Sequence, residues 1–493
     1  MEKEQFNLMA YAVAMEDYDG ALTIAKELKK SYVTTKDNTL ASIFEKIENA
    51  IIHRKNEEYD KEQELWKEIS ELSKDIDNTL SIFAKACYYD AIADSAEEDT
   101  AKNLEYQKKV KKEFEKIGDK ILILVVSAWL EELPEKRANI YEEIADEFNK
   151  ANLENLANQA MGWHYEALTE TAESPKEKAE LWKKAADDYK AGKNDDLYHR
   201  AMGLHYSVLA RATESHEGRA KLNKKAADEF KEGKNEKEYH KEMAWHYYLS
   251  SLLSEDKRKR EDLKSKAVKE TDWLFIANIA LSLSKIPQKT EKIIYLIKDA
   301  ISSYEKYLDE KEKKLPTFTI FIDGNLRDEQ MVKSVTEKTG GYFITKVSPF
   351  LKNKPVEIDE LDTMIERTDF ILMLVDNNVN EMLSFEMGLA YTAGKPVVLF
   401  VSGDISRLNP IFSKAATITQ KLEYAITVLR LFSIIKSGEI LEVEKDEKEK
   451  ITDFLKSIER FKIPELKIKF KPSFIEEEMP LKQKQGRLRG DKV

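Results

Sequence analysis

The chain has 493 residues, which is too long for one hydrophobic core, so we expect two or three folded units. Charged residues make up 35% of the chain and hydrophobic residues 42%, a balance that is typical of folded proteins with long solvated helices and excludes general disorder. The net charge of -12 argues against non-specific nucleic-acid binding as the main task, because clustered Lys and Arg are needed to neutralise phosphate groups.

The sequence also indicates a cellular location. Cys87 is the only cysteine and cannot form an internal disulfide. We find neither an N-terminal signal sequence nor an apolar run of membrane-spanning length. We therefore expect a cytoplasmic protein without a membrane partner.

The first part of the chain contains a 41-residue repeat. Its clearest segment reads AMGWHY at 160–165, AMGLHY at 201–206 and EMAWHY at 242–247. A second segment returns in step at 144–148, 185–189 and 226–230. Two segments per unit indicate two helices per unit, so the pattern predicts an all-α solenoid of helical hairpins over residues 1–312.

The repeat places three histidines, His164, His205 and His246, at matched positions. Such a row could form a metal site or a proton relay, but a repeat also imposes the same packing position several times. We interpret the three histidines as packing residues, and likewise Trp163 and Trp245, which fill gaps between helices. The array resembles the tetratricopeptide-like superfamily, although its unit is longer than the usual repeat. This resemblance implies a protein or peptide partner on a concave face.

After a helix at 290–313 and a break at Pro316, the sequence changes class. Short β-rich runs now alternate with helical stretches, which predicts a mostly parallel sheet covered by helices, an α/β domain at 315–437. We expect strands at 317–322, 342–347, 370–375 and 396–401, an edge strand at 415–419, and helices at 327–338, 356–367, 382–393 and 421–436. Residues 438–493 read as a charged helix and a flexible tail.

The α/β domain offers only carboxylate chemistry. It contains no His and no Cys, because all seven His lie between His53 and His246, and this excludes a Ser-His-Asp triad, a Cys-His pair and the usual zinc sites. It also lacks a phosphate-binding glycine fingerprint. Ligands bind such sheets beyond the carboxyl ends of the strands, where Asp323 and Asp376 follow two predicted strands and Glu386 lies in the next helix.

Helical geometry singles out Glu386. At 100° per residue it falls on the covered side of its helix, opposite the polar residues Ser384, Gly388 and Thr392. A covered carboxylate is costly unless it has partners or meets a pocket, and the alternative is a Glu that escapes to the surface at a loosely packed helix end. We expect the nearby amino end of the helix to help keep Glu386 ionised.

Other polar residues near this edge have structural alternatives. Asp323 can be a turn residue with Gly324, and Asp376 can initiate a loop. We interpret Asn378 and Glu381 as a helix-capping pair.

Residues 385–397, FEMGLAYTAGKPV, together with the strand DFILMLVD at 369–376, resemble the nucleoside 2-deoxyribosyltransferase family and the related TIR-like domains. The resemblance implies a flavodoxin-like fold, with Glu386 as the carboxylate that attacks or stabilises the sugar C1′. Our candidate substrate-binding residues at this sheet edge are Asp323, Gly324, Asp376 and Gly388, with Asp323 or Asp376 as the group that would protonate a neutral purine. The first strand departs from both families, because it ends in Ile322-Asp323-Gly324 without the expected aromatic or serine.

These observations predict a sensor coupled to an effector. The array would recognise a protein partner, and the α/β domain would cleave an N-glycosidic bond of NAD or a related nucleotide without a metal or another cofactor. Activity would depend on homo-oligomer assembly or on the partner, and a role in defence or stress follows only by analogy. The alternatives are a non-enzymatic scaffold whose α/β domain self-associates or binds nucleotide, and a nucleoside deoxyribosyltransferase.

Overall fold

A computed structural model describes residues 3–96, 99–284, 289–326, 328–349, 351, 357–376, 381–404, 412 and 416–437. The chain divides into two compact units, Met1–Thr271 and Asp272–Val493. The charged helix and tail predicted for 438–493 lie outside the described residues.

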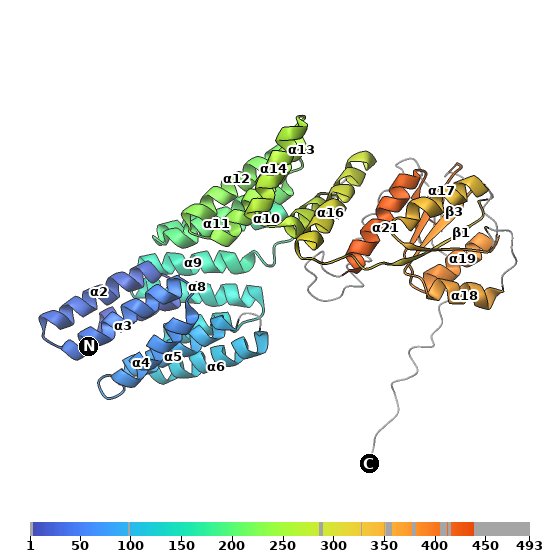
Figure 1. Ribbon diagram of the computed structural model, residues 1–493. Helices are drawn as coiled ribbons and strands as arrows, with labels where there is room; N and C mark the ends of the chain where they lie inside the picture. The colour runs from blue at the N-terminus through green and yellow to red at the C-terminus, as the bar shows by residue number, and fades with distance from the viewer. Residues whose placement is uncertain are drawn as a thin grey trace, which may run out of the picture. The chain divides into compact units, whose positions relative to one another are not determined.

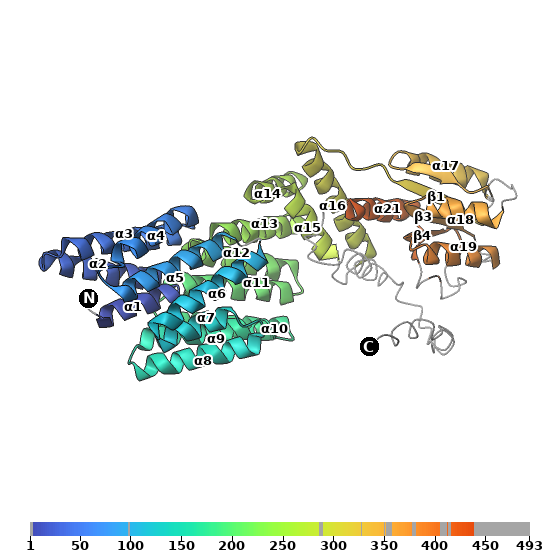
Figure 2. The same cartoon turned by 90° about the horizontal axis from the view of Figure 1, so that it is seen from below.

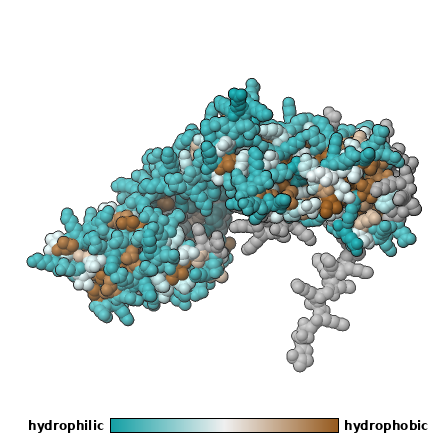
Figure 3. Space-filling view, viewed as in Figure 1, coloured by the Kyte–Doolittle hydropathy of each residue, from teal (hydrophilic) through white to brown (hydrophobic). Residues whose placement is uncertain are grey.

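The first unit is a helical array in which consecutive helices pack in pairs (Figure 1). Helices α8 and α9, α10 and α11, and α12 and α13 form the three hairpins of the 41-residue repeat, which confirms the predicted solenoid. The face of the array seen in Figure 3 is mostly hydrophilic, with scattered hydrophobic residues. The helices are α1 (Lys3–Ala14), α2 (Tyr18–Thr34), α3 (Asn38–Lys55), α4 (Tyr59–Ser73), α5 (Asn78–Ser95), α6 (Thr100–Ile117), α7 (Lys120–Trp129), α8 (Pro134–Lys150), α9 (Glu154–Leu168), α10 (Pro175–Ala191), α11 (Asp195–Ala212), α12 (His216–Glu232), α13 (Glu236–Leu253) and α14 (Lys257–Glu270).

The first two repeats each accept an aromatic ring from the next one. A Cβ atom added to Gly162 on α9 would lie 2.4 Å from the ring of Tyr189 on α10, and one added to Gly203 on α11 would lie 2.6 Å from the ring of Phe230 on α12. Glycine is therefore required where the ring enters, because any side chain would overlap it. The third repeat has Ala244 at this position and Thr271 in place of the ring.

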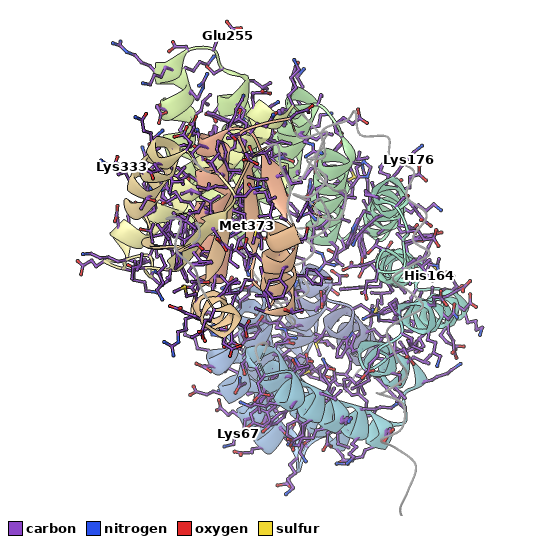
Figure 4. All side chains as sticks on the ribbon, turned by 90° about the vertical axis from the view of Figure 1, so that its right-hand side faces the viewer. Lys67, His164, Lys176, Glu255, Lys333 and Met373 are labelled. Carbon is purple, nitrogen blue, oxygen red and sulfur yellow. The ribbon has the colours of Figure 1, made fainter. Side chains whose placement is uncertain are left out.

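The repeated histidines make repeated contacts, as predicted. The Nδ1 atoms of His164, His205 and His246 lie 2.9, 2.8 and 2.9 Å from the carbonyl oxygens of residues 26 positions earlier, Ala138, Ala179 and Ala220 (Figure 4 labels His164). All three rings are half-buried rather than fully covered. No group of three or more potential metal ligands occurs among the described residues. A regular partner on the neighbouring helix supports the packing interpretation.

The second unit begins before the sheet, with α15 (Trp273–Ser284) and α16 (Thr290–Glu310). The repeat pattern assigns these helices to the array, whereas the compact-unit boundary falls at Thr271. Helix α16 packs on α21 (Leu422–Lys436), where the hydroxyl groups of Tyr304 and Ser437 lie 2.8 Å apart and Arg430 pairs with Glu305. The hairpin α15–α16 is thus part of the body that holds the sheet.

The sheet is fully parallel, with the order β2-β1-β3-β4-β5, which is the doubly wound order of flavodoxin-like domains. Helices α17 and α21 cover one face, and α18 and α19 cover the other (Figures 1 and 2). The central strand β3 is buried along its whole length, including Met373 (Figure 4), as expected for a strand covered on both faces. The elements are β1 (Thr319–Gly324), α17 (Glu329–Gly340), β2 (Ile344–Val347), α18 (Ile358–Glu366), β3 (Phe370–Val375), α19 (Glu381–Thr392), β4 (Val397–Val401) and β5 (Thr417–Thr419).

Among the described helices of either unit, none is long and apolar enough to cross a membrane.

The predicted strands and helices of the α/β region are present in the predicted order, with bounds that differ by a few residues.

Candidate functional site

The candidate site lies where the strand order reverses. The chain leaves β1 toward the β2 edge and returns to build β3, β4 and β5 on the other side of β1, so β1 and β3 flank the switch point. Asp323 is near the carboxyl end of β1 and pairs in register with Met373 of β3. Because side chains alternate along a strand, Asp323 points to the same face as Phe321, the face covered by α18 and α19.

Gly324 fixes the path of the chain just after Asp323. Its φ is +126°, and a Cβ atom at this position would lie 2.1 Å from the carbonyl oxygen of Leu374. The next two backbone N–H groups, of Asn325 and Leu326, donate to that same oxygen at 3.0 and 3.2 Å. Only glycine allows this close approach of β1 to β3. The structure therefore gives Gly324 a backbone role that places Asp323.

Glu386 lies on the face of α19 that packs on the sheet. It is 2% exposed, and its neighbours on this face, Leu383, Met387 and Ala390, are also buried. The residues on the other side of the helix, including Gly388, are exposed. The burial of Glu386 agrees with the face deduced from helical geometry. The alternative, in which the Glu386 side chain lies at the surface, is wrong.

Asp323 and Glu386 form a pair of buried carboxyl groups. Burial raises the pKa of Glu386 to about 9, with the charge of Asp323 and the contact between the two groups as further causes. Burial also raises the pKa of Asp323, to about 6, while Ser348, the Gly324 N–H and Glu386 oppose this rise. Two carboxylates in contact cannot both ionise easily, so near neutral pH the pair holds one proton, mainly on Glu386.

This proton placement corrects one expectation. We expect from the sequence that the amino end of α19 keeps Glu386 ionised, and this is wrong. A helix terminus contributes only about 0.3–1 kcal/mol to a nearby charge. Burial in an apolar surrounding and the adjacent Asp323 both act in the opposite direction and are larger.

Ser348 is a site residue that the sequence analysis missed. It directly follows β2 and is 0% exposed, and its backbone N–H donates to the carbonyl oxygen of Ile322 at 2.8 Å. This contact places its hydroxyl near Asp323, where it lowers the pKa of that carboxyl. The rule that strand carboxyl ends carry the site could have identified Ser348, since it occupies the same position after β2 as Asp376 does after β3.

The carboxylate of Asp323 is also short of donors. Ser348, the Gly324 N–H and Glu386 all lie near enough to lower its pKa, but within the described part of the chain none of them makes a hydrogen bond of regular geometry to either oxygen. Asp323 itself is 0% exposed. Buried polar groups are normally hydrogen-bonded, so this side chain is poorly satisfied by the protein alone.

The other predicted site residues divide into two groups. Asp376 is half-buried at the same sheet edge, where its N–H donates to Oδ1 of Asn325 at 3.0 Å. Gly388 is not brought to the pair, because it is exposed on the opposite side of α19 and a Cβ atom there would meet nothing within 4 Å. The predicted helix-capping pair stays a prediction, because Asn378 and the side chain of Glu381 lie outside the described residues.

Comparisons with known proteins add no relative. No protein-family model matches the chain, and no curated protein matches it either. The resemblance in residues 369–397 therefore rests on the sequence of this chain alone.

Proposed function

We propose that the second unit cleaves an N-glycosidic bond of a nucleotide, with NAD as the favoured substrate, through Glu386 and Asp323. The observation that supports this proposal is the buried carboxyl pair at the switch point, in which Asp323 is left without regular hydrogen-bond partners. Burying such a pair is costly, and strongly shifted carboxyl pKa values in an interior position are typical of functional sites.

The chemistry of this bond suits two carboxyl groups. Its cleavage develops positive charge at C1′, which a nearby carboxylate stabilises. In the free protein Asp323 is the group that carries negative charge near neutral pH, and Glu386 holds the proton. A neutral base could take this proton from Glu386 as it leaves. A nicotinamide leaving group is cationic and needs no acid, and its charge would lower the pKa of both carboxyl groups.

We propose the array as the recognition part, similar to tetratricopeptide-like repeats that bind proteins or peptides. The effector would then respond to a bound partner or to assembly of several chains. An unregulated NAD-cleaving enzyme would harm its own cell, which is the reason to expect such control. Full activity of the second unit alone, unchanged when the array is attached, would exclude this control.

A direct test is to incubate the purified full-length protein with NAD and separately with deoxynucleosides, and to measure substrate loss. Glu386→Gln keeps the size of the side chain and removes its ionisable carboxyl group, so we expect a loss of about 10²-fold or more in rate. Glu360→Gln on α18 is the matched control, since Glu360 is exposed, and it should retain full activity. Cleavage that survives in properly folded Glu386→Gln would refute the mechanism.

A non-enzymatic scaffold remains the second candidate, and the covering of both carboxyl groups favours it. Asp323 and Glu386 are 0% and 2% exposed, so a substrate reaches them only if neighbouring side chains move. The scaffold hypothesis predicts no turnover of either substrate by assembled protein. Transfer of a deoxyribosyl group between bases, without loss of NAD, would instead support the deoxyribosyltransferase.

A further inference from the structure

Asp323 differs from Glu386 in the hydrogen-bond donors that it still lacks. Glu386 holds a proton that it can donate, whereas Asp323 can only accept, and none of its contacts with Ser348, the Gly324 N–H and Glu386 has regular hydrogen-bond geometry. Asp323 is fully covered, so solvent does not reach its oxygens. A ligand that enters this position must therefore bring hydrogen-bond donors.

The chemistry of a nucleotide narrows the choice of donors. Its phosphate groups are anionic and would be repelled by a carboxylate that is ionised near neutral pH. The vicinal hydroxyl groups of a ribose provide two donors on adjacent carbon atoms, which match the two oxygens of one carboxylate. The sugar carbon next to this diol is C1′, the atom at which the glycosidic bond breaks.

Contact between the two carboxyl groups fits this placement. Asp323 and Glu386 are near enough to shift the pKa of each other, so a ligand group on Asp323 lies next to Glu386. If Asp323 holds the 2′ and 3′ hydroxyl groups, its charge lies next to C1′ and Glu386 lies beside the leaving base. This arrangement gives the two carboxyl groups different tasks and requires no further residue.

We propose that Asp323 accepts hydrogen bonds from the 2′ and 3′ hydroxyl groups of a ribose, so that the site selects ribosides over 2′-deoxyribosides. This inference rests on the proposed function, because it assumes that a nucleotide sugar occupies the site. Sites built to hydrogen-bond a substrate hydroxyl reject analogues that lack it by up to about 10⁴-fold, because a buried group is then left unpaired. We expect a preference of about 10²-fold or more.

The test compares NAD with an analogue that lacks the 2′-hydroxyl on the nicotinamide ribose, using kcat/KM for cleavage by the full-length protein. The deoxy analogue is intrinsically more reactive, so Asp323→Asn is measured with both substrates. This variant should lose most of the preference for NAD, whereas Asp359→Asn, at an exposed position of α18, should keep it. Equal use of both substrates by the wild-type protein, or an unchanged ratio in folded Asp323→Asn, would overturn the inference and leave the proposed function intact.

Binding provides a second measurement that does not depend on turnover. Titration calorimetry with ADP-ribose and with its analogue lacking that 2′-hydroxyl should show tighter binding of ADP-ribose by the wild-type protein. This preference without any cleavage would support the inference and refute the proposed enzymatic function. Cleavage without a preference for the 2′-hydroxyl would support the proposed enzymatic function and refute the inference. Neither binding nor cleavage of any of these nucleotides would overturn both.

Discussion

Raising the pH from 5 to 9 should destabilise the second unit, and Glu386→Gln should remove most of this loss. The folded-state pKa of Glu386 lies above its ordinary value, so the folded chain holds a proton that the unfolded chain releases near pH 4.5. The stability that depends on this proton is fully present below the unfolded pKa. It is lost as the pH rises through the folded pKa of about 9.

The size of the effect follows from the shift. The pKa of Glu386 rises from 4.5 to about 9, and each unit corresponds to about 1.4 kcal/mol, which gives a change on the order of 6 kcal/mol in the free energy of unfolding. Glu386 is 2% exposed, so solvent screens it little. For a unit of this size, 1 kcal/mol moves the melting temperature by about 2–4 °C. We therefore expect a decrease of about 10 °C or more.

Differential scanning calorimetry of the full-length protein between pH 5 and 9 measures this directly. Other groups also titrate in this range, so the informative quantity is the difference between the wild-type protein and Glu386→Gln at each pH. The variant should be similar to the wild-type protein in stability at pH 5 and more stable at pH 9. A wild-type transition that falls no more steeply than that of Glu386→Gln would refute the proton assignment.

Two further predictions concern packing. Gly162→Ala should destabilise the array by about 1–3 kcal/mol, because the new Cβ overlaps the ring of Tyr189. Gly388→Ala should leave the second unit equally or more stable, because nothing lies within 4 Å of its new Cβ. Thermal unfolding measures both variants, and an array of unchanged stability in Gly162→Ala would contradict the close contact. A fragment of residues 272–437 should fold, whereas a fragment of residues 315–437 should be less stable, because it loses the contact between α16 and α21. Urea unfolding measures this difference, and equal midpoints for the two fragments would show that the hairpin α15–α16 is not needed for stability.

Much of the architecture was predictable because its signals are local. The 41-residue repeat is visible in the sequence, and it fixed the matched positions of His164, His205 and His246. Alternation of β-rich and helical runs predicted the order of the elements in the α/β region. The face of Glu386 followed from helical geometry alone, because its burial depends only on which side of α19 meets the sheet.

The properties that sequence could not provide depend on contacts between distant segments. Burial raises the pKa of Glu386 most, and Asp323 raises it further; Asp323 is 63 positions earlier and becomes a neighbour only through the sheet order. Ser348 enters the site for the same reason. The amphipathic pattern of α16 predicts a helix with a covered side but does not say what covers it, and the structure shows that α15 and α21 do.

The glycine positions of the array give its stacking a direction. The first two hairpins of the repeat each receive a ring from the next one, at Gly162 and then at Gly203, and the series ends with Ala244 at the glycine position and Thr271 at the ring position. A copy of the 41-residue unit inserted within the series would find both a receiving glycine before it and a ring after it. A copy added after Thr271 would find neither. The array can therefore lengthen by internal duplication. Its last hairpin cannot be extended in the same way, because Ala244 and Thr271 replace the glycine and the ring.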